Sequence, residues 1–481
     1  MSQARIASCI PLPLEQKTLV NVIEKAKDWA LMHGVGMRDR KHFNKDVIQI
    51  APFALLPSPF PKAEFEKAVE LQPVLNELMH KVAHDDDFLM NTLQNALQVD
   101  EFTASLYDIW MKVRKEEVSQ SINLGLFRSD YLMQCHEDCK IKQVEFNTIA
   151  TSFGGISSYL PAMSRYILRQ LGSGDLIKHM PENLALSGLC GGIIEAYDLF
   201  GVPSAVVLFV VEEVSYNICD QRFHEFEICE KRPDIVIYRK TLTEIHDECV
   251  LNDKKQLVIE GRPVAVVYYR SGYEPAQYPS SKEWEARLTV EKSTAIKCPS
   301  IHYQLAGTKK VQQALAAPGV LEKFMGVGPD TNRVRDIFTG LFSLDFDENG
   351  ERAVEMALAD ADRFVLKPQR EGGGNNMYGE EVRQALLRMR HSRERAAYIL
   401  MERIVPPLIP SYVVRPGATV PPPVVDIVSE LGIYGVIIGT RDSIHCNRQV
   451  GHVLRSKLAD ANEGGVAAGL GAVDSPYLVD M

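Results

Sequence analysis

The sequence predicts a mixed α/β fold from three observations. Apolar residues recur at helical spacing near the amino terminus, apolar runs of strand length alternate with a helical segment between residues 204 and 269, and small-residue turns follow both kinds of element. The chain of 481 residues is long enough for roughly three domains. Its 46% hydrophobic and 24% charged residues are typical of a globular protein with a sizeable core.

The first predicted element is a helix. Its apolar positions follow the helical period, and Gly34 supplies a stop signal. These positions are Leu19, Val22, Ile23, Ala26, Trp29 and Ala30. Further helical patterns continue to about residue 122, and residues 141–146 then alternate as a strand with Glu145 and Asn147 at its end.

The middle of the chain predicts a parallel sheet flanked by helices. Apolar runs at 205–211, 235–238 and 264–269 read as strands, and a helix is expected near 220–230. Strands that alternate with helices in this way form βαβ units. We expect them to make a compact domain of their own at about 204–305.

The last third combines helices, a buried strand and loops. Gly307 to Lys310 open a helical stretch, and Phe364, Val365 and Leu366 read as the end of a buried strand. The proline-rich segment 406–423 predicts a surface connection, because proline suits loops and sheet edges. Small residues dominate 463–471, which suits either a mobile closing loop or close helix packing.

Composition narrows the functional classes. A net charge of −10 and a pI near 5.7 argue against nucleic acid as the main partner. No run of 18 apolar residues exists, and Pro11 and Pro13 interrupt the first apolar stretch, so neither a membrane span nor a secretory signal is expected. We therefore expect a cytosolic protein.

The cysteines give no sign of a disulfide framework. There are nine, scattered along the chain, and we expect them to be reduced. Cys135 and Cys139 are the closest pair, with His136 between them. A metal site at this spacing is one interpretation, but no second pair completes four ligands, so thiols near a hairpin are favoured.

The most informative segment runs from Lys367 to Asn376. It combines cations, the carboxylate of Glu371 and the glycines 372–374 directly after a buried strand. Glycines let backbone N–H groups approach phosphate oxygens, and a carboxylate holds Mg²⁺ on a polyphosphate. The segment therefore predicts a site for a metal-bound polyphosphate, although a glycine-rich hairpin with solvated charges is the alternative.

Other polar residues extend this site. Glu145 and Asn147 share one face of an extended strand, so with Glu371 they are candidate Mg²⁺ ligands. A solvent-facing strand end is the alternative for this pair. Lys309 and Lys367 both flank turns that contain glycine, as expected of cations that serve one phosphate chain.

Three arginines are candidate substrate holders: Arg128, Arg270 and Arg455. Each lies near small or turn-forming residues, and arginine binds carboxylates with two hydrogen bonds. The pattern favours a substrate with more than one carboxylate, while a surface ion pair is the alternative, above all for Arg128 beside Asp130. No Ser-His-Asp or Cys-His set and no Walker loop stands out, which favours phosphate chemistry without a covalent enzyme intermediate.

Four segments together resemble the eukaryotic glutathione synthetase family, in the same order and over essentially the whole chain: 144–155, 305–313, 367–381 and 455–469. The resemblance implies an ATP-grasp fold, with a main body at 1–203 and 306–481, a lid at about 340–420 and an inserted substrate-binding domain at 204–305. It also implies a homodimer. The implied activity is an ATP-dependent ligation of glycine to γ-glutamylcysteine through an acyl phosphate, with Mg²⁺.

The resemblance also implies roles for individual residues. Mg²⁺ would bind Glu145, Asn147 and Glu371, and the reacting centre would hold Lys309, Lys367 and Arg455. The ATP site would comprise Glu145, Lys309, Lys367, Glu371, Gly372, Gly373, Gly374, Asn375, Asn376, Tyr378, Met401, Glu402, Arg403, Ile404, Glu430, Lys457 and Glu463. The substrates would meet Arg128, Ile149, Ala150, Thr151, Ser152, Ser215, Tyr216, Asn217, Gln221, Arg270, Ser271, Gly272, Tyr273, Arg455, Val466 and Ala467.

Two positions depart from the family pattern. Ala150 stands where some relatives have serine, and Glu463 where some have aspartate. Neither change affects the expected reaction class. A ligase that uses β-alanine or another small amine remains open, because one methylene discriminates by only about 1–3 kcal/mol. A nucleotide-sensing protein without catalysis is the alternative from another class, and it predicts damaged metal ligands, whereas all three candidates are present.

Overall fold

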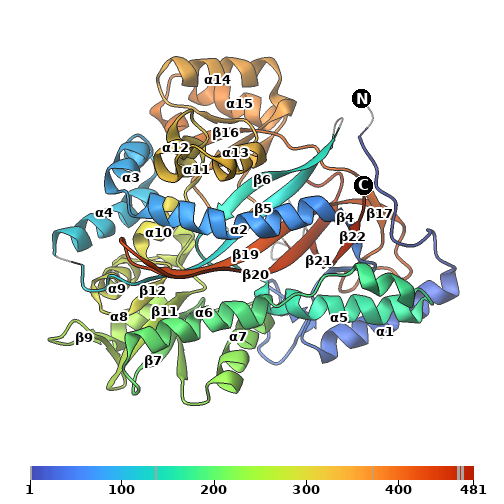
Figure 1. Cartoon of the computed structure of the whole chain (residues 1–481), viewed down its shortest axis with the longest axis horizontal. Helices are drawn as coiled ribbons and strands as arrows, with labels where there is room; N and C mark the ends of the chain where they lie inside the picture. Colours follow the sequence, from blue (N-terminus) through green and yellow to red (C-terminus); the bar gives the residue numbers. More distant parts are fainter. Residues whose placement is uncertain (1–2, 117, 136–137, 372, 463–465, 467–470) are drawn as a thin grey trace.

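The computed structural model describes residues 3–116, 118–135, 138–371, 373–462, 466 and 471–481. Three larger sheets organise this part of the chain, with helices packed against them (Figure 1). The predicted mixed α/β fold is confirmed.

The largest sheet has eight strands and forms the body of the protein. Its order is β18 (Val413–Val414), β3 (Phe53–Ala54), β21 (Gly471–Asp474), β20 (Ile444–Leu458), β19 (Val425–Gly439), β5 (Asn123–Cys135) and β6 (Cys139–Asn147), and β17 (Ile409–Ser411) also pairs with β19. Helix α2 (Lys62–Ala83) covers one face and α6 (Ala185–Phe200) the other. Gly435 of β19 packs on Asn76 of α2, while the next residue, Val436, packs on Gly192 of α6.

The amino-terminal region is helical, with short strands that the sequence did not predict. Helix α1 (Gln16–Met32) confirms the first predicted element and buries its apolar face, although Trp29 is only half-buried. Helices α3 (Asp86–Leu93) and α4 (Glu101–Lys115) follow α2. The prediction of helices throughout this region is wrong at β1 (Gly36–Met37), β2 (Gln49–Ile50), β3 and β4 (Ser58–Pro61), which are too short to show a periodic pattern.

The predicted parallel sheet is present, and its strands lie at the lower left in Figure 1. Strands β7 (Val206–Val210), β8 (Val236–Lys240), β11 (Arg262–Tyr269) and β12 (Ile296–Cys298) are parallel. Strands β9 (Val250–Leu251) and β10 (Leu257–Ile259) add an antiparallel edge. Helices α7 (Ile218–Lys231), α8 (Leu242–Glu248) and α9 (Ser281–Lys292) complete this region, whose domain boundaries stay a prediction.

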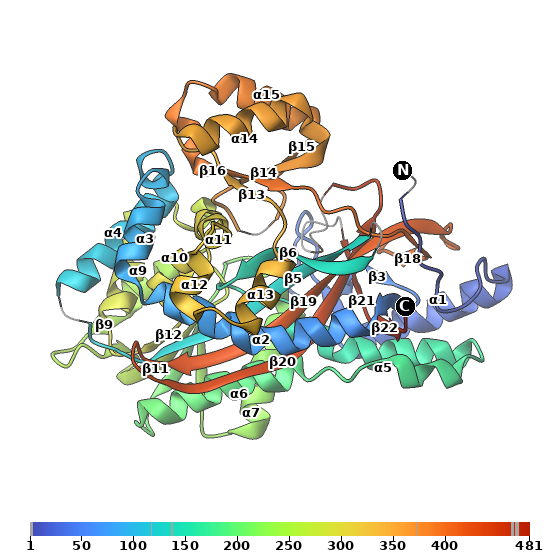
Figure 2. The same cartoon turned by 45° about the horizontal axis from the view of Figure 1, so that its top comes forward.

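A four-stranded antiparallel lobe stands above the body (Figure 2). It is built from β13 (Leu341–Ser343), β14 (Phe364–Pro368), β15 (Met377–Tyr378) and β16 (Tyr398–Glu402), with α14 (Glu348–Ala359) and α15 (Glu380–Met389). These elements have their own apolar core. The proline-rich segment that follows contributes β17 and β18, which pair with strands of the main sheet. The extent of the lid at about 340–420 stays a prediction.

The remaining elements connect these parts. Helix α5 (Gly154–Gln170) follows β6, and β22 (Pro476–Val479) pairs with β4. The predicted helix after Gly307 is α11 (Lys309–Leu315), which lies between α10 (Ile301–Ala306) and the pair α12 (Val320–Met325) and α13 (Pro329–Ile337). Short 3₁₀ turns occupy 96–98, 174–179, 275–277, 361–363 and 393–397.

One cysteine pair differs from the prediction of reduced thiols. Cys135 and Cys139 form a disulfide, because the β5–β6 hairpin places them opposite each other in register. Spacing in the sequence does not reveal this register. The other seven cysteines, all within the described residues, are free. His136 lies outside the described residues.

Within the described ranges, no helix is both long and apolar enough to span a membrane.

Candidate active site

A cavity of about 950 Å³ lies where the main sheet, the parallel sheet and the lobe meet. Strands β5, β6, β19 and β20 supply one wall, the segments after β7 and β11 another, and the lobe strands β14 and β16 the third. Most of the predicted site residues line it. They are Arg128, Glu145, Asn147, Ile149, Ala150, Ser152, Tyr216, Asn217, Gln221, Arg270, Tyr273, Lys367, Glu371, Gly373, Asn376, Tyr378, Met401, Glu402, Arg403, Ile404, Glu430, Arg455, Lys457 and Val466.

The other predicted residues fall into two groups. Thr151, Ser215, Ser271, Gly272, Lys309, Gly374 and Asn375 are described but are not part of the cavity wall. Gly372, Glu463 and Ala467 lie outside the described residues, as does most of the predicted closing loop at 464–471.

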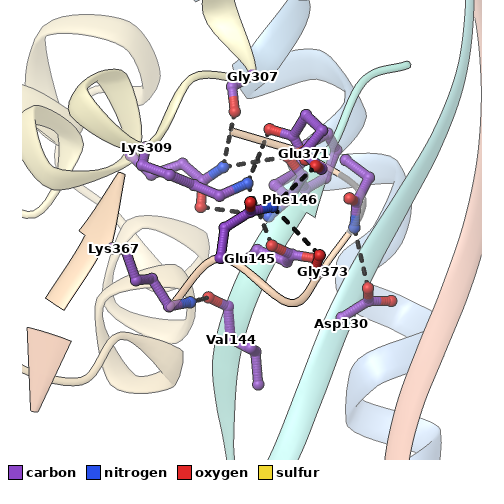
Figure 3. A network of polar contacts seen from close by, with 12 residues as sticks. Asp130, Val144, Glu145, Phe146, Gly307, Lys309, Lys367, Glu371 and Gly373 are labelled. Carbon is purple, nitrogen blue, oxygen red and sulfur yellow. Dashed lines mark hydrogen bonds and ion pairs between the residues drawn. The ribbon is translucent and has the colours of Figure 1, made fainter. Parts of the chain in front are cut away.

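The ammonium group of Lys309 joins two carboxylates from different elements (Figure 3). Its Nζ lies 2.7 Å from Oε1 of Glu371, which follows β14, and 3.1 Å from Oε2 of Glu145, near the end of β6. Lys309 itself is the first residue of α11. Two candidate metal ligands that are far apart in the sequence are thus brought together by one buried cation.

Charge and burial oppose each other in this cluster. Burial disfavours an ionised Glu145, but Lys309, Lys367, Arg128 and Arg455 outweigh it and lower the Glu145 pKa. Burial raises the pKa of Glu371. The positive charge of Lys309 opposes this shift, and the negative charge of Glu145 adds to it. Burial also disfavours the charged Lys309, yet Glu145 and Glu371 raise its pKa. Glu145 is therefore the carboxylate that stays ionised most firmly.

A second buried cation reaches the same strand end. Lys367 lies in β14, and its Nζ donates a hydrogen bond of 2.9 Å to the carbonyl oxygen of Val144 (Figure 3). Burial lowers the pKa of Lys367, although Glu145 partly compensates. The strand thus brings a cation to the cavity wall, as the sequence predicted, but in an antiparallel sheet.

The loop after β14 needs glycine for its backbone conformation. Gly373 and Gly374 have φ of 73° and 82°, in the left-handed region that side chains disfavour. Because glycine has no Cβ, a ligand can also approach the backbone of such a turn closely. The loop geometry supports the interpretation of the segment as a phosphate-binding turn.

Asp130 of β5 is a buried carboxylate that connects three predicted residues. It accepts from Arg128 at 2.6 and 2.8 Å, from Nδ2 of Asn147 at 2.9 Å and from Nη2 of Arg455 at 2.9 Å. Arg455 also contacts Glu430. The ion pair considered for Arg128 is therefore present, but it is buried rather than on the surface, and of its two residues only Arg128 lines the cavity.

A second buried pair anchors Arg270. Its Nη2 lies 2.8 Å from Oδ2 of Asp220 and 3.1 Å from Oγ of Ser152. Asp220 also accepts from backbone N–H groups at the start of α5, including those of Phe153 and Gly155. Burial disfavours the Asp220 anion, but Arg270 and the other donors lower its pKa. The pair fixes Arg270 at the carboxyl end of the parallel sheet.

Three buried nitrogen atoms of the cavity arginines lack a hydrogen-bond partner within the described ranges. They are Nε and Nη1 of Arg270 and Nε of Arg455. Unpaired buried polar groups are costly, so such groups at a cavity wall indicate a ligand that supplies the missing oxygens. Arginines suit a carboxylate or a phosphate.

Sequence reasoning missed Asp130 and Asp220 as site residues. Both are fully enclosed carboxylates whose importance depends on the cations that fold against them. Asp220 lies beside the selected Gln221, which was the available signal. Glu212, another cavity residue, was also missed, because it belongs to no recognisable sequence motif.

The candidate metal ligands have the donor types that Mg²⁺ prefers. No group of three or more His, Cys, Asp and Glu side chains is placed to hold a metal in the described part of the chain. The set Glu145, Asn147 and Glu371 has two carboxylates and one amide, all on the cavity wall. Mg²⁺ binds through one or two carboxylates and completes its shell with water and phosphate oxygens, so this donor set fits.

Paired ammonium groups, carboxylates and a glycine loop around one cavity are the features of enzymes that catalyse phosphoryl transfer from a nucleotide. The sequence comparisons narrow this class. The model of the family described as "Eukaryotic glutathione synthase, ATP binding domain" matches residues 16–478. The chain belongs to the eukaryotic glutathione synthase family, as its motifs predicted, and it has an ATP-binding domain.

Curated relatives match over nearly the whole chain. Glutathione synthetases of Xenopus laevis and Homo sapiens are each 44% identical over 97% of this chain and 98% of their own length. The chloroplastic glutathione synthetase of Arabidopsis thaliana is 39% identical over 97% of this chain and 86% of its own. A solved structure of a glutathione synthetase like-effector from Globodera pallida has the same fold, with a TM-score of 0.79 and 24% identity over 98% of this chain and 100% of that chain.

Proposed function

We propose that the protein is a glutathione synthetase, which joins glycine to γ-glutamylcysteine and converts ATP to ADP and phosphate. The observation that carries the proposal is the cluster in which Lys309 joins Glu145 to Glu371 beside Lys367. It adjoins a cavity with room for both a nucleotide and a small peptide. Family membership supports the same activity.

The reaction has two steps. The cysteinyl carboxylate of the dipeptide attacks the γ-phosphorus of ATP, the bond to the ADP oxygen breaks and an acyl phosphate forms. The glycine amine then attacks the acyl carbon, a C–N bond forms and phosphate leaves. Such transfers depend mainly on positioning and charge neutralisation, which Lys309, Lys367 and Arg455 are placed to provide.

ATP would lie between the lobe and the body. Val365 of β14 and Met401 of β16 give an apolar wall for the base, with Ile404 just beyond. The cations and the glycine loop lie on the phosphate side. The remaining expected contacts, which include Tyr378, Glu430 and Lys457, line the same cavity.

Mg²⁺ would bind Glu145, Asn147 and Glu371, and when bound it would neutralise phosphate charge. Lys309 forms ion pairs with both carboxylates and holds them close together. Asn147 is oriented by its hydrogen bond to Asp130. This set keeps the carboxylates close enough to serve one phosphate chain.

The dipeptide would lie at the carboxyl end of the parallel sheet, where two nitrogen atoms of Arg270 have no partner among the described residues. Glycine would lie near Arg455 and Val466. We extend the proposal to an inserted substrate domain at 204–305, a lid formed by the lobe, a homodimer and a cytosolic location. We also propose roles in this site for Glu463 and Ala467, which lie outside the described residues.

The test is ADP release by the purified protein with Mg²⁺, ATP and γ-glutamylcysteine. Glycine, β-alanine and no acceptor are compared, and the product is identified by mass. We expect glutathione with glycine. Preference for β-alanine would overturn the assignment of glycine as the acceptor. ATP binding without acceptor-dependent turnover would overturn the proposal that the protein is an enzyme.

A further inference from the structure

Glu212 is a cavity residue for which the proposed mechanism has no use. It lies two residues beyond the end of β7, and Arg270 directly follows the neighbouring parallel strand β11. Val210 and Tyr269 are partners in this register, and the backbone N–H of Arg270 donates to the carbonyl of Val210. Because both strands end at the same edge of the sheet, the Glu212 carboxylate and the Arg270 guanidinium line the same end of the cavity.

The Glu212 carboxylate is held in place from one side. Its Oε1 accepts a hydrogen bond of 2.5 Å from Nε2 of Gln277. The Oε1 of Gln277 in turn accepts from the backbone N–H groups of Gly272, Tyr273 and Glu274, at 2.6, 2.8 and 3.2 Å. Gln277 therefore ties Glu212 to the loop that follows Arg270. In the part of the chain that the structure describes, the second oxygen, Oε2, has no hydrogen bond or ion pair.

The surroundings do not neutralise this carboxylate. Burial raises the pKa of Glu212, and Glu274 reinforces the shift, while Gln277, Arg40 and Arg270 oppose it. Its charge also acts on Tyr216 and Tyr273, whose pKa values rise mainly through burial. A cation from outside the chain would stabilise the Glu212 anion at this place.

The proposed substrate carries such a cation. A γ-glutamyl group is linked through its side-chain carboxyl, so it keeps a free α-carboxylate and a free α-ammonium group. Nε and Nη1 of Arg270 are unpaired donors for the carboxylate. Resting on the proposed function, we infer that Glu212 binds the α-ammonium group of the γ-glutamyl residue and so selects dipeptides with a free α-amino group.

The test compares two substrates with two proteins. The substrates are γ-glutamylcysteine and glutarylcysteine, which lacks only the α-amino group, and the proteins are the wild type and Glu212→Gln. Glutamine keeps an oxygen that accepts from Gln277 but removes the charge. We expect the wild-type KM for glutarylcysteine to be roughly tenfold or more above that for γ-glutamylcysteine, because a hydrogen bond between two charged groups is lost.

In Glu212→Gln, the KM for γ-glutamylcysteine should rise by roughly the same factor, with kcat and the KM for ATP unchanged. The variant should no longer distinguish the two substrates. Glu213→Gln is the matched control, because Glu213 is the exposed neighbour and should behave as wild type. An unchanged KM for ATP also shows that the variant has folded.

Two results would overturn the inference. One is a Glu212→Gln variant that still prefers γ-glutamylcysteine as strongly as the wild type does. The other is loss of the preference in Glu274→Gln instead, which would assign the ammonium group to the neighbouring carboxylate. A wild type that forms no product from γ-glutamylcysteine would overturn the proposed function itself, so the two failures are distinguishable.

Discussion

Arg455 on β20 contacts Asp130 on β5 across 325 residues of sequence, with 2.9 Å between Nη2 and Oδ2. Asp130 is fully buried and does not line the cavity. It instead orients Arg455, Arg128 and Asn147 from behind the cavity wall. The geometry of the glycine end of the proposed site therefore depends on a residue that the reaction does not touch.

Gly432→Ala should disturb this arrangement. Gly432 of β19 lies against the pair, and an added Cβ would be 2.6 Å from Oδ1 of Asp130 and 2.8 Å from Cδ of Arg128. We expect the free energy of unfolding to fall by about 1–3 kcal/mol, because overpacking forces buried groups apart. The KM for glycine should rise as Arg455 shifts. Urea unfolding and steady-state kinetics measure the two effects.

Gly328→Ala is the control for this substitution. Its backbone is extended, and nothing lies within 4 Å of the added Cβ. Both its stability and its kinetics should match the wild type. A Gly432→Ala protein with the same two properties would show that the Asp130 cluster tolerates displacement.

Glu371→Gln should retain the fold but lose turnover. The substitution removes one of the two carboxylates that Lys309 joins, and with it a proposed Mg²⁺ ligand. A single electrostatic contact at a transferring phosphate contributes about 3 kcal/mol, so kcat should fall by roughly two orders of magnitude. Turnover is measured at saturating Mg²⁺, with Glu355→Gln on the exposed face of α14 as the control. Near-normal kcat in Glu371→Gln would remove this residue from the metal site.

Asp220→Asn should weaken dipeptide binding selectively. The change removes the charge that holds Arg270 and caps the start of α5, while one acceptor oxygen remains. Because Arg270 loses its anchor, the KM for γ-glutamylcysteine should rise several-fold, and the KM for ATP should stay constant. Equal effects on both substrates would indicate a general loss of structure instead. Circular dichroism checks that α5 is retained.

His80 should make stability depend on pH. Its Nδ1 lies 2.5 Å from the hydroxyl of Tyr303 and its Nε2 lies 2.9 Å from the carbonyl of Thr440, which suits a neutral ring. Burial and then His84 lower the pKa of His80 to about 4. The unfolded chain, with a pKa near 6.5, binds the proton first. The contribution of neutral His80 to the free energy of unfolding is therefore fully present above about pH 6.5. It is lost as the pH falls toward 4, by up to about 3 kcal/mol.

The substitution His80→Gln should remove this part of the pH dependence. Glutamine can accept from Tyr303 and donate to Thr440 without titrating. The free energy of unfolding is measured by urea titration at pH 7, 6 and 5, with the exposed His391→Gln as the control. The slope between these pH values should decrease only in His80→Gln, and an unchanged slope would contradict the assignment.

The sequence revealed strands whose apolar pattern was regular and missed others, among them the long strand β5. Residues 235–238 and 264–269 were found because they are apolar runs between turns. Strand β5 was missed because it is buried on both faces, and its polar residues, among them Arg128 and Asp130, pair with each other rather than face water. A strand that buries charges shows no alternation of polar and apolar residues.

For the site, the sequence indicated the kinds of residue but not how they are arranged. The residue types of Lys309, Lys367 and Glu371 indicated phosphate chemistry without any structure. That Lys309 meets Glu145 and Glu371 depends on the packing of α11 against β6 and the loop after β14, which periodicity does not specify. The Cys135–Cys139 bond is a similar case, because hairpin register decides it.

The pairing of β4 with β22 and of β3 with β21 joins residues near position 60 to the last ten of the chain. While the protein is being synthesised on a ribosome, β3 and β4 emerge long before their partners β21 and β22. Arg455, which pairs with Val473 of β21, also emerges late. The nascent chain therefore carries open strand edges until β21 and β22 have been made, and folding proteins expose such edges to aggregation. A chain that lacks β21 and β22 should therefore be less soluble than the full chain, because β3 and β4 then keep unpaired edges.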